Sequence, residues 1–422
     1  MNYFSYKKDD LYCEDLSVAY IAEQIGTPFY LYSYSTITRH FQVFNNAFKG
    51  LDHLTCFSLK SNSNLAILRL LALEGGGADV VSGGELFRAL RAGIAPDKIV
   101  YSGVGKTPSD MELALKSGIL MFNVESDQEL QALNGIAENS GSKAMIAIRI
   151  NPDVEPKTHP YIVTGFGESK FGIPIKDSLN TYALAKRLKN IELKGISCHI
   201  GSQLTEIDPF VEALRKLREL HRKLKKMGLD IKFLNLGGGL GITYHDEKPP
   251  HPLEYARALR ETIGANKFTL ILEPGRVIIG NAGILVTRVL YTKSAAKKRF
   301  IIVDAGMNDL IRPTLYNSFH AVQPVKMAHS NMFTASLVGP ICETGDFLAK
   351  DRKMPPFKPG DLVAIMSAGA YGFSMASNYN SRPRPAEVLV KGKLFSIIRA
   401  RETYDDLING EMIPEFLEKN SV

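Results

Sequence analysis

The stretch LTCFSLKSNSNLAILRLLAL, Leu54 to Leu73, decides the fold because it joins a short apolar strand to a helix through a lysine. Residues Leu54 to Leu59 are typical of a strand, and the leucines behind the capping-type residues Asn62 and Asn64 recur at helical spacing. Lys60 stands where the strand ends. Lysine is seldom desolvated, and desolvation lowers the pKa of an amine. This lysine is therefore either a solvated turn residue or a nucleophile that is uncharged near neutral pH.

Seven further strand-like stretches follow the same rhythm, with helical patterns between them. The eight predicted strands are Leu54–Leu59, Ala78–Ser82, Ile99–Ser102, Met121–Glu125, Ala144–Ile150, Lys194–Ile200, Lys232–Leu236 and Phe268–Glu273. Strands that alternate with helices indicate a parallel sheet, and eight such units close a (β/α)8 barrel. An open doubly wound sheet remains the alternative, because strand counts from one sequence are error-prone.

The character of the chain changes after Gly275. Alternating, β-branched stretches such as GILVTRVLYT and EVLVKGKLFSIIRA follow, separated by turns rich in Pro, Gly and Asn. They predict an antiparallel β domain of sandwich or barrel-like form that also takes in the strand-like PFYLYS near the start. The expected division is a barrel over residues 36–280 and a β domain over residues 1–35 together with 281–422.

The bulk composition is that of a globular protein. Its 422 residues favour two domains, and 45% hydrophobic and 23% charged residues are ordinary proportions. No apolar run is long enough for a membrane span, and the opening residues lack an apolar signal core. The cysteines Cys13, Cys56, Cys198 and Cys342 lie far apart, which argues against a disulfide framework or a structural zinc site. We therefore expect a soluble cytoplasmic protein without a metal site or a membrane contact.

The net charge of +7 raises the question of nucleic-acid binding. The densest basic run lies between Val211 and Met227, where leucines form a buried stripe and the lysines and arginines a solvated face. No aromatic residues interleave with these basic residues, as a nucleic-acid groove would prefer. The pattern argues against a nucleic-acid partner.

Polar residues fall at the predicted strand ends, where a barrel carries its active site. Lys60 ends the first strand, Asp79 lies in the second, His199 in the sixth, and Glu273 ends the eighth. The glycine-rich run Gly237–Gly241 follows the seventh strand, and its N–H groups could approach an anion or simply form a tight turn. A lysine opposite such a loop suits a phosphorylated aldehyde. Pyridoxal 5′-phosphate fits, with Lys60 as its covalent link and Glu273 near its pyridine nitrogen.

Eight motifs extend this pattern along most of the chain. They are FSLKSN, GADVVSGGEL, NPDVEPKTHPYIVTGFGESKFGI, CHIGSQ, LNLGGGLGITY, EPGR, GPICETGDFLAKDR and GAYGFSMASNYNSRPRPAEVLV. In this order the set resembles the diaminopimelate decarboxylases, which belong to the alanine-racemase-like fold group of pyridoxal-phosphate enzymes. The resemblance implies decarboxylation of meso-2,6-diaminopimelate to L-lysine and CO2, the last step of lysine biosynthesis. It also implies a homodimer with shared active sites.

The resemblance further implies roles for individual residues. Lys60, His199 and Cys342 would be catalytic, with Cys342 as a general acid contributed by the partner subunit. The implied cofactor contacts are Lys60, Asp79, His199, Ser202, Gly238, Gly239, Glu273, Gly275, Arg276 and Tyr371. The implied substrate contacts are Arg276, Arg312, Tyr316, Glu343 and Tyr371. Guanidinium groups suit the distal carboxylate of the substrate, and Glu343 suits its distal ammonium.

Two other functions stay open from the sequence. The first is decarboxylation of another basic amino acid or a carboxylated polyamine, of the ornithine, arginine or carboxynorspermidine type. Such an enzyme would need an acidic pocket, whereas Arg312 and Tyr316 favour a distal carboxylate. The second is a non-catalytic homologue that only binds cofactor or a partner. Loss of the lysine, the glycine loop or the cysteine would be expected there, and all three are present.

Overall fold

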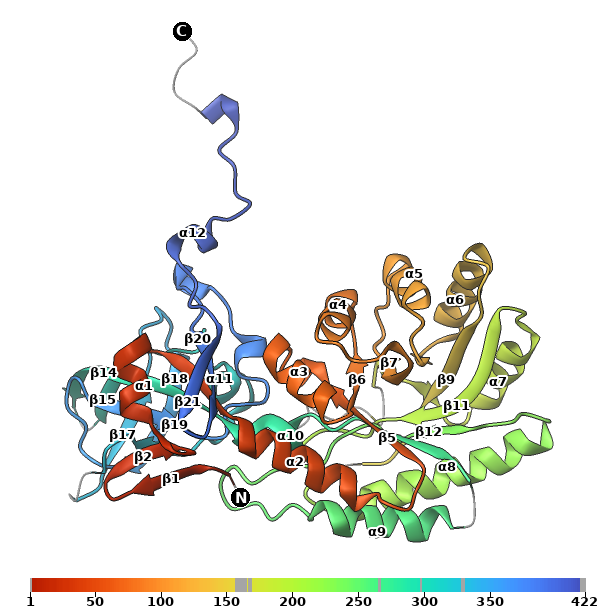
Figure 1. Ribbon diagram of the computed structural model, residues 1–422, viewed down its shortest axis with the longest axis horizontal. Coiled ribbons are helices and arrows are strands. Elements are labelled where there is room, and N and C mark those ends of the chain that lie inside the picture. Colours follow the sequence, from red (N-terminus) through yellow and green to blue (C-terminus); the bar gives the residue numbers. More distant parts are fainter. Residues whose placement is uncertain are drawn as a thin grey trace.

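Eight parallel strands close into a barrel in the computed structural model, which describes residues 2–155, 165, 169–264, 267–296, 298–327 and 331–417 (Figure 1). Part of the motif that begins at Asn151 lies outside these residues. The barrel strands are β5 (His53–Ser58), β6 (Gly77–Val80), β7 (Ile99–Tyr101), β8 (Met121–Val124), β9 (Ala144–Asn151), β11 (Ile191–Cys198), β12 (Phe233–Asn235) and β13 (Thr269–Leu272). A two-residue strand, β10 (Ile173–Pro174), adds to β9. Because β8, the last strand in the order β9-β11-β12-β13-β5-β6-β7-β8, also pairs with β9, the sheet is closed and the open-sheet alternative is wrong.

Helices cover the outside of the barrel and begin close to the strand ends. They are α2 (Tyr34–Ala47), α3 (Leu65–Leu73), α4 (Gly83–Arg91), α5 (Pro108–Ser117), α6 (Asp127–Asn139), α7 (Ser178–Arg187), α8 (Asp208–Lys226) and α9 (Pro252–Ile263). Side chains of Asn64, Ser82, Thr107 and Ser126 cap four of them by accepting a backbone N–H. These caps fix where each loop ends, and therefore how the strand tips are presented.

A second, mixed sheet forms next to the barrel. Its strand order is β18-β17-β15-β14-β4-β20-β21, with β19 paired to β14 and β16 paired to β19. These strands are β4 (Phe29–Ser33), β14 (Gly283–Ala295), β15 (Lys298–Val303), β16 (Val322–Pro324), β17 (Phe333–Val338), β18 (Phe347–Met354), β19 (Leu362–Ile365), β20 (Ala386–Lys391) and β21 (Leu394–Arg399). The strands β1 (Phe4–Lys7), β2 (Asp10–Cys13) and β3 (Leu16–Ser17) form a small separate sheet, followed by α1 (Val18–Ile25).

The expectation that this domain is antiparallel needs one correction. β4 pairs in parallel with β20, and β15 pairs in parallel with β17. The first exception follows from position in the chain, because an N-terminal strand enters the sheet between two strands from the C-terminal part. Alternating hydrophobicity marks a strand but carries no information on the direction of its neighbour.

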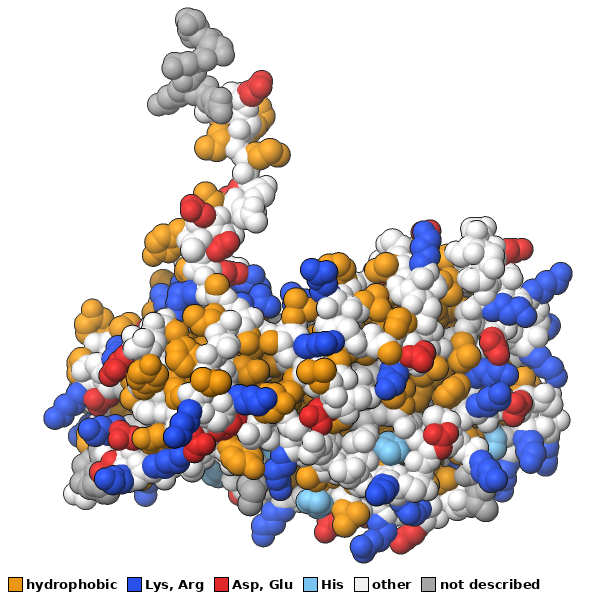
Figure 2. All heavy atoms as spheres, in the orientation of Figure 1, with side chains coloured by type: hydrophobic (Ala, Val, Ile, Leu, Met, Phe, Trp, Pro, Cys, Tyr) orange, Lys and Arg blue, Asp and Glu red, His pale blue; other side chains and the backbone are white. Residues whose placement is uncertain are grey.

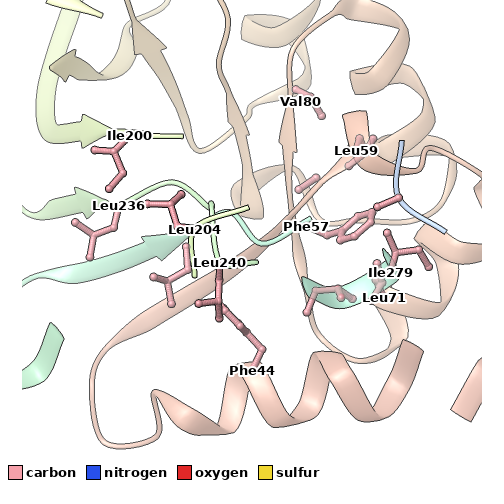
Figure 3. Close-up of a cluster of buried hydrophobic side chains, with 14 of the residues drawn as sticks. Phe44, Phe57, Leu59, Leu71, Val80, Ile200, Leu204, Leu236, Leu240 and Ile279 are labelled. Atoms are coloured by element: carbon pink, nitrogen blue, oxygen red, sulfur yellow. The ribbon is translucent and has the colours of Figure 1, made fainter. Parts of the chain in front are cut away.

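Apolar side chains fill the space beneath the site. Figure 3 shows Phe44 of α2, Phe57 of β5 and Leu236 and Leu240 from the loop after β12 within one buried cluster. Phe57 is fully buried, so its truncation to alanine is expected to cost about 3–5 kcal/mol. Within the described residues, no helix has the length and apolar character needed to cross a membrane.

A buried polar network joins the two parts of the chain behind the first barrel strand. The side chain of Asn64 donates to Glu387 Oε2 at 2.8 Å, and Arg399 Nε donates to the same oxygen at 2.7 Å. The Tyr32 hydroxyl donates to the other carboxylate oxygen at 2.8 Å. Removing one partner would leave a buried charge uncompensated, so this network holds the loop that follows β5 against the mixed sheet.

Candidate active site

A cavity of about 470 Å³ opens at the carboxyl ends of the barrel strands. This volume lies within the range of small-molecule sites. Seven residues named from the sequence line it, namely Lys60, His199, Ser202, Arg276, Arg312, Tyr316 and Tyr371. The remaining lining residues are Val81, Ser102, Gly103, Val104, Gly105, Arg149 and Phe171. Polar residues at the predicted strand ends therefore point to this cavity, although they do not include all the residues that line it.

Lys60 lies in a one-turn 3-10 helix, Leu59–Ser61, directly after β5. Its Nζ donates to Asp79 Oδ2 at 3.1 Å, and the Ser58 hydroxyl donates to the same oxygen at 2.5 Å. Desolvation favours the neutral amine, but the attraction of Asp79 and of further negative groups outweighs it and holds the pKa of Lys60 above its ordinary value. The contact with Asp79 therefore favours the charged amine in this structure over the uncharged form that the sequence left open. An ammonium paired with a buried carboxylate occupies the position.

The segment after Gly369 fixes the Lys60 turn from the side of the mixed sheet. The Asn62 amide donates to Gly369 O at 3.2 Å, and Tyr371 N donates to Ser61 O at 2.8 Å. Tyr371 has a φ of 55°, a strained backbone conformation for a large side chain. The surrounding hydrogen bonds hold this strain and place the Tyr371 ring at the cavity wall.

Glu273 lies at the floor of the barrel mouth, directly after β13. Its Oε1 accepts hydrogen bonds from the amides of Asn235 at 2.5 Å and Asn123 at 3.3 Å. Burial, followed by repulsion from Asp79, raises the pKa of Glu273 above its ordinary value. The group is therefore poised to share a proton with a ligand that approaches from the cavity.

His199 follows β11 and contacts the glycine turn. Gly238 N–H donates to His199 Nδ1 at 3.2 Å, so the ring proton of the neutral tautomer is on Nε2. Desolvation, together with the charges of Lys60 and Arg149, holds the pKa of His199 well below its usual range. A neutral aromatic ring therefore faces the cavity.

The glycine turn requires glycine for steric reasons. A Cβ at Gly237 would lie 2.6 Å from His199 Nδ1, and one at Gly238 would lie 2.2 Å from Glu273 O. Gly239 has a φ of 115°, which side chains disfavour. The turn thus packs its backbone between the ends of β11 and β13, a contact that no other residue type would permit.

Arg276 is buried at the start of the short helix α10 (Arg276–Ile279), behind its cap residue Gly275. Its Nη1 donates to the Tyr244 hydroxyl at 2.7 Å and its Nη2 to Ser202 Oγ at 3.0 Å. The guanidinium lies 4.9 Å from the centre of the Tyr371 ring. Its buried Nε finds no hydrogen-bond partner among the described residues. The arginine thus retains a donor for an anionic ligand.

Arg312 lies in α11 (Arg312–Tyr316) and forms the second cationic part of the cavity wall. Its Nε donates to His320 Nε2 at 3.3 Å, and its guanidinium lies 5.1 Å from the centre of the Tyr244 ring. Burial and the charge of Arg312 lower the pKa of His320 to about 3, so this histidine is a neutral acceptor. Two buried guanidinium groups therefore lie on one cavity, an arrangement suited to a ligand with two anionic ends.

Cys342 and Glu343 do not line this cavity. Both side chains are exposed, on the loop between β17 and β18. The loop is nevertheless held firmly, because Cys342 N donates to Asn380 Oδ1 at 2.8 Å and the Tyr379 hydroxyl to Glu343 Oε2 at 3.0 Å. Within one chain the structure therefore separates these two residues from Lys60.

Several residues that shape the site were not predicted from the sequence. Glu125 Oε1 accepts from Gly103 N at 2.9 Å and from Arg149 at 2.8 Å, which fixes the loop over the cavity. Tyr244 and His320 support the two arginines, and neither occupies a strand tip. Tyr244 could have been found, because it ends the glycine-rich motif LNLGGGLGITY.

The residues present fit pyridoxal phosphate. Besides Arg276 Nε, the buried Asp79 Oδ1 finds no partner among the described residues, so polar atoms around Lys60 still require a ligand. Lys60 offers an amine for the aldehyde, and Glu273 offers a carboxylate for the ring nitrogen. A guanidinium, hydroxyls and backbone N–H groups are available for the phosphate. These groups occur in one cavity or directly at its floor.

Comparison with known proteins first defines the class. The family model described as pyridoxal-dependent decarboxylase, pyridoxal binding domain, matches residues 34–280. The diaminopimelate decarboxylase of Aquifex aeolicus is 51% identical over 96% of both chains, and that of Pseudomonas aeruginosa is 50% identical over 98% of this chain and 99% of its own. The chain belongs to the diaminopimelate decarboxylase family of pyridoxal-dependent decarboxylases.

Solved structures agree with this assignment. The diaminopimelate decarboxylase of Helicobacter pylori in complex with L-lysine has a TM-score of 0.90 and 45% identity, covering 93% of this chain and 98% of its own. The diaminopimelate decarboxylase of M. jannaschii in complex with L-lysine has a TM-score of 0.94 and 38% identity, covering 98% of this chain and 99% of its own. The predicted barrel with an adjoining β domain is thereby confirmed.

Proposed function

We propose that the protein removes CO2 from meso-2,6-diaminopimelate and releases L-lysine. The relatives carry this activity in their names, and two similar structures hold L-lysine. The observation that carries the proposal is the pair of buried guanidinium groups, Arg276 and Arg312, on the cavity of Lys60. A substrate with a distal carboxylate would neutralise them, whereas a diamine-forming substrate such as ornithine would leave Arg312 uncompensated.

The cofactor supplies an electron sink for the negative charge left when CO2 departs. In our proposal Lys60 binds its aldehyde carbon, and Asp79, 3.1 Å from the amine, accepts from Nζ and orients it. Glu273 would hold a proton at the pyridine nitrogen, because burial and its two asparagine partners keep it at that position. His199 would lie against the ring face as a neutral group.

The remaining side chains would bind the charged ends of cofactor and substrate. Ser202, Gly238, Gly239, Gly275, Arg276 and Tyr371 would surround the phosphate. Arg312 and Tyr316, with Arg276 and Tyr371 behind them, would bind the distal carboxylate of the substrate. Glu343 would accept its distal ammonium, and Cys342 would deliver the final proton to the substrate carbon.

We also propose that the active site is shared in a homodimer. Cys342 and Glu343 are exposed and lie outside the cavity of their own chain, so a second chain would have to present them. Their loop is fixed by Asp346, whose carboxylate accepts Ile341 N and Met307 N at 2.7 Å. A loop held this firmly is suited to insertion into a partner's cavity.

The proposed organisation follows from the same sheets. A barrel domain would span residues 36–280, and residues 1–35 with 281–422 would form the β domain, which is supported by the pairing of β4 with β14 and β20. The four cysteines are unpaired, which supports a cytoplasmic location.

The function is tested by two readouts on one sample. Pyridoxal phosphate bound to the protein gives visible absorbance, and CO2 release is measured with meso-diaminopimelate and with L-ornithine. We expect absorbance and CO2 release from diaminopimelate only. Absorbance without CO2 release from diaminopimelate would support cofactor binding and refute diaminopimelate as the substrate.

A further inference from the structure

The C-terminal arm, defined here as residues 401–417, leaves the body of the molecule after β21 and extends away from it (Figure 1). Its root is fixed, because Glu402 accepts hydrogen bonds from Arg384 Nε at 2.6 Å and from Asn378 Nδ2 at 2.7 Å. A short capped helix, α12 (Tyr404–Leu407), follows. From Ile408 onward every described residue is exposed. The arm therefore has a defined origin and an unsupported outer part.

The composition of the arm is that of a contact surface. Its large apolar side chains are among the most exposed of the described residues, with Met412 at 91% and Phe416 at 85%. Figure 2 shows them along the arm, with acidic side chains between them. Residues 401–417 contain five carboxylates and one arginine, although the whole chain carries a charge of +7. Apolar groups in such a row mark a site of protein contact, and the acidic residues favour a basic partner.

A surface that complements the arm lies beside the mouth of the cavity. We call it the mouth patch, formed by Phe87 and Arg91 of α4, Val104, and Leu113 of α5. Phe87 is 64% exposed, and Val104 and Leu113 are 45% and 40% exposed. α4 and α5 are in close contact here, because Gly83 N donates to Asp110 Oδ1 at 3.1 Å. Val104 also lines the cavity, so the patch includes one residue of the active-site wall.

We propose that the C-terminal arm of each chain packs on the mouth patch of a second copy. The root of the arm and the Cys342 loop belong to one exposed edge, since Asn378 holds Glu402 and Asn380 holds Cys342. This inference rests on the proposed shared-site dimer. A partner whose cavity receives the Cys342 loop brings its mouth patch next to that edge, because the patch adjoins the cavity.

Geometry and charge both support a second copy as the occupant. In Figure 1 the arm and the helices α4 and α5 project on the same side of the molecule, whereas α8 and α9 lie on the other side. Fifteen residue steps from Glu402 to Leu417 span at most roughly 50 Å, enough to cross the face of a barrel. In this contact Arg88 and Arg91, in the last turn of α4, would face the carboxylates of the arm. Two-fold symmetry makes the exchange reciprocal, so each arm covers one patch.

The test is the dimer dissociation constant, measured by analytical ultracentrifugation on the full chain and on variants. The double substitution Met412→Ser and Phe416→Ser changes only exposed side chains, and a chain ending at Ala400 removes the arm. Phe87→Ser changes the patch. Leu253→Ser on α9 is the control, since this leucine is 52% exposed on the other side of the molecule. We expect each arm or patch variant to weaken the dimer at least tenfold and the control to leave it unchanged.

The combination of arm and patch variants identifies the contact. If the arm packs on Phe87, the combined variant should have the same dimer dissociation constant as either single variant, because both changes remove the same contact. Unchanged dimerisation of the chain that ends at Ala400 would overturn the proposal, and additive effects would overturn the assignment of the patch. A full chain that stays monomeric at all concentrations would refute the shared-site dimer itself, and the arm contact with it.

Discussion

The two halves of the proposed active site differ in how they are supported. The Lys60 half is built within one chain, where buried carboxylates, amides and arginines each contact neighbours from several strands. The Cys342 half is held by hydrogen bonds but exposed, and its reactive side chains do not line the Lys60 cavity of their own chain. In the proposed dimer, one subunit supplies all the cofactor contacts of a site, whereas the groups for proton delivery and for the distal ammonium come from the other subunit.

Removing Lys60 should produce the largest effect, because it lies in the half of the active site that one chain builds on its own. Lys60→Ala is expected to abolish the visible absorbance of the bound cofactor and to lower CO2 release by about 10⁴-fold or more, because the covalent link is lost. Borohydride reduction of the loaded wild-type protein followed by peptide mapping should place the label on Lys60. The matched change Lys226→Ala on α8 should alter neither readout. A label on any other lysine would show that the site is misplaced.

Mixing two inactive variants tests whether the Lys60 and the Cys342 of one active site come from different subunits. In a mixed dimer of Lys60→Ala and Cys342→Ala, one site receives both defects and the other receives neither. Random exchange makes about half of the dimers mixed, so about a quarter of the sites should regain activity. Subunit exchange is verified independently with a fluorescent label. If exchange occurs and activity stays at the level of the separate variants, Cys342 does not serve a partner's cavity.

The substrate preference should depend on Arg312. Arg312→Met is expected to reduce the preference for meso-diaminopimelate over L-ornithine by roughly tenfold to a hundredfold, because a lost charged contact is worth about 1–3 kcal/mol. The measurement is kcat/KM for both substrates. Arg299→Met is the control, since this arginine lies over the Phe333 ring in the mixed sheet. Equal preference in Arg312→Met and the wild type would remove Arg312 from the substrate site.

The burial of His320 next to Arg312 should make the free energy of unfolding depend on pH. His320 binds a proton near pH 6.5 in the unfolded chain but only near about 3 in the folded chain. Between these values the unfolded state holds more protons, so the free energy of unfolding falls as the pH falls, by up to about 1.4 kcal/mol per pH unit. In His320→Gln this contribution should be missing. Urea unfolding of both proteins from pH 7 to 4 measures the difference, and parallel profiles would contradict it.

Much of the barrel could be predicted because its signals are local. All eight predicted strands occur, most with ends shifted by one to three residues, since apolar runs and capping residues mark them directly. The residues at the strand tips came together because a barrel gathers its carboxyl ends. His320 could not be found in this way, because its importance arises from its contact with Arg312. Glu125 ends the fourth predicted strand and could have been found by the same reasoning. The sequence also left the charge state of Lys60 open, because that state depends on the contact with Asp79.

The position of β4 has a consequence for synthesis on the ribosome. This strand, complete at residue 33, lies between β14 and β20, and its parallel neighbour begins 357 positions after Phe29, at Ala386. At about 5–20 residues per second, the strand must wait roughly 20–70 seconds for that neighbour to be made. During this time its N–H and C=O groups form an open edge on a largely apolar strand, FYLYS, the kind of edge that recruits other chains. We expect nascent chains of this protein to need chaperone protection until the last strands emerge.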